Sequence, residues 1–240
     1  MLPPSATLLA EAESVTMLTA NGVAVAQLSY TFSFNGLSLP RGKNWLANAL
    51  DADRVLEDAH RAKEAGAEVV IVSIHWGTEY SHTPNSQQTS IAKKLLASPD
   101  IDLILGHHAH VVQPLQRIGD KWVAYGMGNE VAYQNQAQDT RDGIMPRFTF
   151  TEVSPGVFRV SKAEVFPIHM WLDGKPTRLY EVESALADPA VPASIKASCR
   201  ASRKRTLNVL DSMGAMDAGL IVHGAESTAT PTPTTSASPA

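Results

Sequence analysis

Histidines crowd into one part of this 240-residue chain. Five of the eight histidines lie between His75 and His110, and three of them occur within four residues, in the segment Gly106-His107-His108-Ala109-His110. Neutral imidazole is a good ligand for Zn, Fe, Mn or Ni. His108 and His110 are two residues apart, so a tight loop can turn both rings toward one centre, and Gly106 permits the sharp turn at its start. We therefore predict that this segment binds a metal ion.

The two histidine clusters each follow an apolar run that is typical of a buried strand. One run, 68–74, precedes His75, and the other, 101–105, precedes the second cluster. Ligands of open α/β sheets bind outside the carboxyl ends of the strands, so we expect His75 to lie beside His108 and His110. A metal ion held there would polarise a phosphoryl or carbonyl oxygen and lower the pKa of a bound water toward ~7.

Other side chains near these loops have more than one possible role. His107 flanks the pair and could be a ligand, a proton donor or a group that orients a ligand. Glu79 follows His75 on the same loop and could orient a histidine or bind substrate, and a solvated acid is an equal alternative. Asn129 is expected to serve a turn. The other histidines have no partner pattern and are predicted to lie on the surface: His60, His82, His169 and His223.

Alternating strand and helix patterns predict a layered α/β domain. Apolar runs indicate strands over 23–30, 67–74 and 101–105, and helical spacing indicates helices over 51–65 and 87–97. The second half favours β structure, with one hairpin over 111–118 and 121–125 and another over 148–153 and 157–167. Short helices are expected within 181–213.

The charge and the ends of the chain limit the classes of partner and site. A net charge of −4 gives no electrostatic footprint for nucleic acid, and we interpret the basic cluster 196–205 as a solvated helix face. The single Cys199 excludes an intramolecular disulfide and a cysteine metal cluster.

Residues 1–13 do not have the pattern of a signal peptide, and no stretch has the ~18 apolar residues of a membrane helix. The Ser, Thr, Ala and Pro residues of 224–240 predict a disordered tail.

Three segments together resemble a known family. They are Ser73-Ile-His-Trp-Gly-Thr-Glu-Tyr80, Leu105-Gly-His-His-Ala-His-Val-Val-Gln-Pro114 and Tyr125-Gly-Met-Gly-Asn129. Their combination is similar to the CapA-type proteins of bacterial poly-γ-glutamate capsule synthesis, which belong to the calcineurin-like metallophosphoesterase superfamily. The resemblance covers about 20–135 and extends loosely to about 170. It implies a CapA-like domain over 20–170, followed by a short helical extension over 171–223 and the tail.

The resemblance also implies a fold and a site. The expected fold is α/β, as part of a four-layer α/β/β/α sandwich with a β-rich C-terminal half. His75, His108 and His110 match metal ligands of the superfamily. His107 is the alternative ligand if the alignment with the superfamily is shifted. His107 and Glu79 are the catalytic candidates. The implied cofactors are divalent transition metal ions (Mn, Fe or Zn), and the implied reaction is metal-dependent hydrolysis. The implied partners are an anionic polymer or phosphoester substrate and proteins of a capsule-synthesis complex, at the cell envelope or the extracellular face.

The chain departs from the superfamily pattern upstream of His75. No Gly-Asp or Gly-Asn-His sequence occurs there, and Glu130 follows Asn129 where the family usually has an aromatic residue. The missing carboxylates would bridge two metals, so we expect at most one weakly held ion. The chain is interpreted as the C-terminal part of such a domain. Two hypotheses follow: a hydrolase whose site is complete only in a full-length form, or a non-catalytic scaffold that binds an anionic polymer or partners of the synthesis complex.

Overall fold

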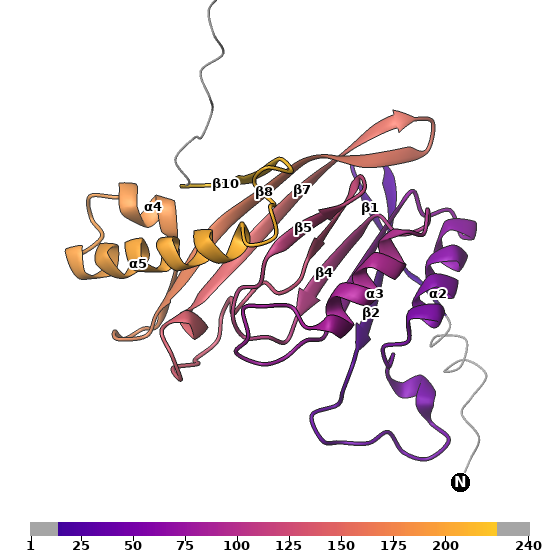
Figure 1. Ribbon diagram of the computed structural model, residues 1–240, viewed down its shortest axis with the longest axis horizontal. Coiled ribbons are helices and arrows are strands. Elements are labelled where there is room, and N and C mark those ends of the chain that lie inside the picture. The colour runs from indigo at the N-terminus through magenta and orange to yellow at the C-terminus, as the bar shows by residue number, and fades with distance from the viewer. Residues whose placement is uncertain (1–13, 225–240) are drawn as a thin grey trace, which may run out of the picture.

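The computed structural model describes residues 14–224, which form two β-sheets flanked by helices (Figure 1). The larger sheet has six strands in the order β1 (Thr16–Ala20), β2 (Val23–Thr31), β3 (Val69–His75), β4 (Leu103–His107), β6 (Lys121–Ala124) and β5 (Leu115–Ile118). The second sheet contains β10 (Leu220–Val222), β8 (Val157–Trp171) and β7 (Asp142–Ser154), and β9 (Arg178–Glu181) pairs with β8.

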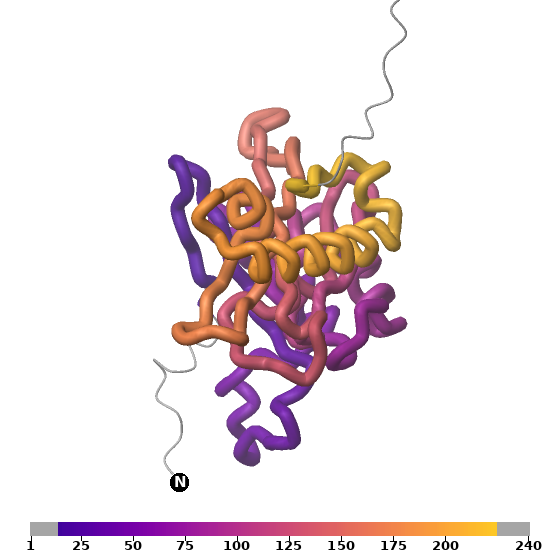
Figure 2. The backbone as a smooth tube through the Cα atoms, turned by 90° about the vertical axis from the view of Figure 1, so that its left-hand side faces the viewer, coloured from indigo at the N-terminus to yellow at the C-terminus, as the bar shows by residue number. Residues whose placement is uncertain are grey.

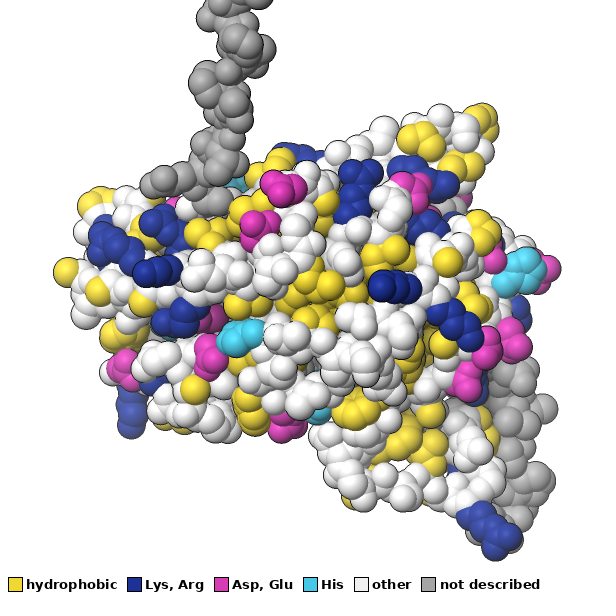
Figure 3. Space-filling model, viewed as in Figure 1, with side chains coloured by type: hydrophobic (Ala, Val, Ile, Leu, Met, Phe, Trp, Pro, Cys, Tyr) yellow, Lys and Arg dark blue, Asp and Glu magenta, His cyan; other side chains and the backbone are white. Residues whose placement is uncertain are grey.

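Helices pack against both sheets. Helices α2 (Ala52–Glu64) and α3 (Ser86–Leu96) lie against the larger sheet, and α4 (Val182–Ala187) and α5 (Ala193–Leu210) lie against the second sheet (Figures 1 and 2). Short 3-10 turns occur at η1 (Asn44–Leu46) and η2 (Asp139–Arg141). Two sheets with helices packed against them confirm the predicted α/β fold class. Lys and Arg side chains gather at the end of the molecule where α5 lies (Figure 3).

The central strands are buried on both faces. Alternate residues of β2 and β3, such as Leu28 and Val72, pack with α2 and α3 in one apolar cluster. The intervening residues of β4 and β6, such as Leu103 and Trp122, pack with β7 and β8 in another. This burial explains why the apolar runs are continuous rather than alternating.

The first long helix and the first three parallel strands lie close to where the sequence predicted them. The Asp51 side chain accepts hydrogen bonds from the backbone of Asp53 and Arg54 and so caps α2, as predicted. Strands β2, β3 and β4 lie within two residues of the predicted ranges. The second hairpin is longer than expected, since β7 begins at Asp142 and β8 ends at Trp171. The segment 171–223 contains β9, β10 and the 18-residue α5, and most of the predicted tail lies outside the described residues.

Candidate metal and hydrolase site

The site is built where three adjacent parallel strands end. Strand β2 pairs in parallel with β3, and β3 pairs in parallel with β4, with Thr31 opposite His75 and His75 opposite His107. The carboxyl ends of the three strands therefore lie side by side at one edge of the sheet. The loops that leave them carry Phe32, the 76–85 segment and His108.

Three imidazoles gather at this edge. The ring centroids of His75 and His108 are 4.3 Å apart, and those of His108 and His110 are 6.2 Å apart. Aromatic rings flank the group. Phe32 lies 5.0 Å from the His108 ring, and the half-exposed Tyr80 stacks on the His110 ring at 6.1 Å. The structure thus brings together the three histidines that the sequence singled out as metal ligands.

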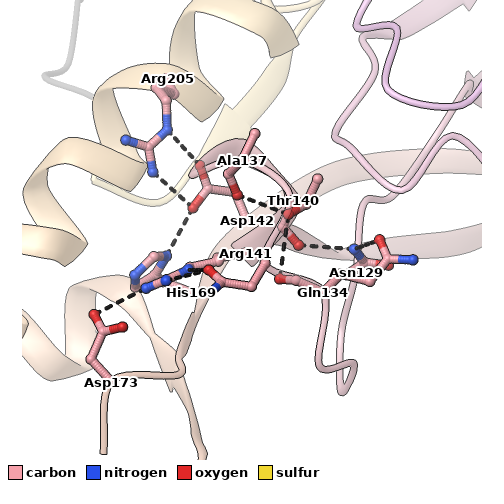
Figure 4. A network of polar contacts seen from close by, with 10 residues as sticks. Asn129, Gln134, Ala137, Thr140, Arg141, Asp142, His169, Asp173 and Arg205 are labelled. Carbon is pink, nitrogen blue, oxygen red and sulfur yellow. Dashed lines mark hydrogen bonds and ion pairs between the residues drawn. The ribbon is translucent and has the colours of Figure 1, made fainter.

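Hydrogen bonds fix two of the three rings. His110 Nδ1 lies 2.9 Å from Asn129 Oδ1, and Asn129 Nδ2 donates to the backbone carbonyls of His110 and Thr140 at 3.1 and 2.8 Å. The amide oxygen can only accept, so His110 Nδ1 carries a proton and donates this hydrogen bond, and in the neutral tautomer the lone pair is on Nε2. His75 Nδ1 lies 2.9 Å from Thr31 Oγ1. Asn129, for which sequence analysis predicted only a turn role, therefore orients His110. Figure 4 shows Asn129 bonded to Thr140.

The loop backbone is held in uncommon conformations. His108, His110 and Tyr80 have φ values of 98°, 57° and 62°, in the left-handed region that non-glycine residues seldom adopt. The Tyr80 amide donates to the Ala109 carbonyl at 2.7 Å, which ties the two loops together. Strained residues persist only when the surrounding structure determines them, and they cluster at functional sites.

The surroundings keep two of the rings neutral. Burial lowers the pKa of His75, the neighbouring histidines lower it further, and Glu79 opposes the shift. Burial likewise lowers the pKa of His108, and Glu79 again opposes it. Because the ordinary histidine pKa is already below 7, both imidazoles are neutral at pH 7 and their lone pairs are available.

The two catalytic candidates lie at the margin of this group. The Glu79 side chain is exposed and forms no hydrogen bond with any described residue, although its charge acts on His75 and His108. His107 ends β4 and has no ring contact with the other described histidines. Burial lowers the pKa of His107, and Glu130 opposes this shift.

Three of the four histidines predicted to lie on the surface are buried or half-buried, and one of them, His223, stacks on the Phe166 ring. His169 is 1% exposed, and its Nδ1 donates to Asp142 Oδ1 at 2.8 Å. His82 is half-buried, with its nitrogens 2.7 Å from the Val112 carbonyl and 3.0 Å from Asp139 Oδ2. His60, by contrast, is exposed on α2 as predicted.

The fit to a metal ion is partial. Two imidazoles that bind one tetrahedral ion at ~2.0–2.1 Å have ring centroids roughly 5 Å apart, and the two measured separations lie on either side of this value. Yet within residues 14–224 no group of three or more His, Cys, Asp and Glu side chains is arranged so that it could hold a metal ion. Imidazole donors suit a single transition-metal cation by their chemistry, although their present positions do not form such a group. The two-cation site that the resemblance implies does not fit these residues.

Residues 6–134 match the model of the family described as "Bacterial capsule synthesis protein PGA_cap". The chain belongs to this family. The match spans β1 to the loop after β6 and includes all three gathered histidines. The CapA-type resemblance in the sequence is therefore confirmed.

Two curated relatives are similar over the same part of the chain. The PGA biosynthesis protein CapA of Bacillus subtilis (strain 168) is 30% identical over 146 residues, which are 60% of this chain and 37% of that protein. The capsule biosynthesis protein CapA of Bacillus anthracis is 28% identical over 141 residues, which are 58% of this chain and 34% of that protein. The chain thus spans little more than a third of the length of these relatives.

Solved structures share a more distant likeness. The sulfate thiohydrolase SoxB of Thermus thermophilus is 18% identical with a TM-score of 0.42, over 81% of this chain and 28% of that chain. The calcineurin-like phosphoesterase YfkN of Bacillus subtilis is 13% identical with a TM-score of 0.41, over 81% and 57% of the two chains. The strand pairings of this chain define its fold independently of these structures. Within residues 14–224, no helix has the length and apolar character needed to cross a membrane.

Proposed function

We propose that this chain carries the histidine side of a metal-dependent hydrolase site that acts in bacterial capsule synthesis at the cell envelope. The observation that carries the proposal is the meeting of His75, His108 and His110 at the ends of the adjacent strands β3 and β4, with the His110 ring fixed by Asn129. We propose that these three histidines hold one divalent transition metal ion, Mn, Fe or Zn. The proposed substrate is a phosphoester or an amide of an anionic polymer.

Each residue has a separate part in this proposal. A bound divalent ion would polarise the phosphoryl or carbonyl oxygen and lower the pKa of a bound water toward ~7. Thr31 and Asn129 hold the rings of His75 and His110 in fixed orientations. We assign proton transfer to His107 and Glu79, two further ionisable side chains at these strand ends. Phe32 and Tyr80 flank the rings of His108 and His110.

Metal binding tests the proposal directly. The wild-type chain, freed of metal and titrated with Zn²⁺ or Mn²⁺ in a calorimeter, is expected to bind one equivalent. The double variant His108→Ala, His110→Ala is expected to lose this binding, together with hydrolysis of a model phosphodiester. The matched control is His60→Ala, His223→Ala, which removes two histidines elsewhere and should bind as the wild type does. Equal binding by all three proteins would overturn the proposal.

Asn129 gives a second prediction for the same site. Partners that orient a metal-binding histidine typically contribute 10- to 100-fold to metal affinity, so Asn129→Ala should weaken Zn²⁺ binding by about that factor. Asn129→Asp keeps an oxygen facing His110 Nδ1 and should lose much less. Gln134→Ala, which removes only another contact of Asn129, is the control. Calorimetric affinities that are the same for Asn129→Ala and the control would contradict the orienting role.

A second candidate function is a non-catalytic scaffold for an anionic polymer or for proteins of the synthesis complex. The observation in its favour is that no described carboxylate completes a metal site with the histidines. The measurements above separate the two candidates: metal binding with hydrolysis supports the first, and a folded chain that does neither supports the second.

A further inference from the structure

Helix α5 concentrates positive charge in a chain whose net charge is negative. Its 18 residues include five of the chain's 20 Lys and Arg residues and no Asp or Glu. The buried face of the helix, which includes Ile195 and Cys199, packs toward the second sheet and α4. The basic residues thus occupy the remaining faces.

The five cations fall into two groups. Arg205 binds the buried carboxylate of Asp142, and Arg203 pairs with Glu183 at 3.3 Å, so these two arginines anchor the helix. Lys196, Arg200 and Lys204 form no side-chain hydrogen bond or ion pair with any residue in the described range 14–224. Arg200 and Lys204 are exposed and Lys196 is half-exposed. We call these three residues the α5 basic row.

The α5 basic row has a regular spacing. Its members are four residues apart, so they follow one face of the helix at intervals of ~6 Å. In an extended chain, side chains on alternate residues recur every ~7 Å on one side. An extended polymer with acidic groups on alternate residues would therefore meet successive members of the row.

A hollow beside the row adds a place for one anionic group. It has a volume of about 380 Å³ and is lined by Arg200, Arg203, Lys204, Leu207, Asn208 and Gly224. Arginine binds carboxylates through two parallel hydrogen bonds, and this chain already contains such pairs: Arg147 with Glu164, and Arg205 with Asp142. Lys and Arg side chains are plainly visible at this end of the molecule (Figure 3).

Two other kinds of anionic partner need features that this surface does not provide. Single-stranded nucleic acid is held by aromatic side chains on which bases stack, and membrane-surface helices insert large apolar side chains. Among the large apolar side chains that are exposed within residues 14–224, none belongs to α5. We infer that the α5 basic row is a docking surface for an extended polycarboxylate chain. The inference does not require the histidine site to be catalytic.

Binding of a fluorescently labelled poly-L-glutamate to the full chain tests this surface. The triple variant Lys196→Gln, Arg200→Gln, Lys204→Gln is expected to bind about 10- to 100-fold more weakly in fluorescence anisotropy, since three charge contacts are lost. The control Arg41→Gln, Lys43→Gln, Lys93→Gln removes the same charge elsewhere and should change binding less than about 2-fold. Thermal melts establish that both variants fold, and Arg200→Lys provides a variant that keeps the charge.

Three results would overturn the inference. One is an equal loss in both triple variants, which would show a general charge effect. Another is tighter binding of the wild type to an oligothymidylate or to phosphatidylglycerol vesicles than to poly-L-glutamate. The third is a loss of poly-L-glutamate binding in His108→Ala, His110→Ala that equals or exceeds the loss in the α5 triple variant, which would place the main polymer contacts at the strand ends. Failure of metal binding alone leaves the α5 surface unaffected, so the two proposals fail separately.

Discussion

Replacement of Gly106 by Ala is expected to lower the free energy of unfolding by about 3–5 kcal/mol. A Cβ at Gly106 would lie 2.0 Å from the Tyr125 carbonyl oxygen and 2.5 Å from Trp76 Nε1. Those two groups are hydrogen-bonded to each other at 2.9 Å, and both side chains are fully buried. The extra methyl group must therefore push apart β3, β4 and the segment after β6, and it must break a buried hydrogen bond.

Chemical unfolding measures this loss. The matched control is Gly156→Ala, in the turn between β7 and β8, where an added Cβ meets nothing within 4 Å but φ is 71°. It should cost only about 1–2 kcal/mol, from backbone strain alone. Gly106→Ala should also weaken metal binding, because Gly106 immediately precedes His107 and His108. A cost for Gly106→Ala no greater than for Gly156→Ala would show that the strands separate easily at this point.

The parts of the fold that sequence analysis predicted are those with local signals. Asp51 caps α2 through the backbone of the next few residues, and β3 is a continuous apolar run because both its faces are covered. The gathering of His75 with His108 followed from one rule, that ligands lie at the carboxyl ends of parallel strands. No knowledge of side-chain contacts was needed for that prediction.

The parts that were missed depend on pairings between distant residues. Strand β1 has five exposed residues and no alternation of polar and apolar residues, and it forms because the turn at Asn21-Gly22 pairs it with β2. The early part of β7 contains Pro146, which argues against a strand. Pro146 is tolerated because β7 lies at the edge of its sheet, where one row of amides needs no partner.

The burial of His169 was missed for the same reason. Its partner Asp142 is 27 residues away in sequence, and Arg205, which binds the same carboxylate, is 63 residues from Asp142. No local periodicity reports such a contact. A buried charged group that binds two donors from different elements can be recognised only once the strands are paired and α5 is in place.

The second large effect is expected at this carboxylate. Asp142 is 3% exposed and accepts hydrogen bonds from His169 Nδ1 at 2.8 Å and from Arg205 Nε and Nη2 at 2.8 and 3.1 Å (Figure 4). It therefore joins β7, β8 and α5 at one point. Asp142→Ala should lower the free energy of unfolding by about 3–5 kcal/mol at pH 7, because it leaves His169 and Arg205 without their shared partner. Glu183→Ala, which frees only the half-exposed Arg203 of the same helix, should cost less than about 1 kcal/mol.

The effect of Asp142 should also depend on pH in a defined direction. Burial alone raises the pKa of Asp142, but the hydrogen bonds from His169 and Arg205 outweigh burial and hold that pKa below its ordinary value. A carboxyl group whose pKa is lower in the folded protein stabilises the fold fully above its unfolded pKa of ~3.9, and this contribution disappears as the pH falls through the folded pKa. The contribution of the Asp142 carboxylate to the difference in unfolding free energy between the wild type and Asp142→Ala should therefore shrink as the pH falls below ~4. A difference that grows on acidification would mean that Asp142 is protonated in the folded protein, and α5 would then be held by packing rather than by this buried ion pair.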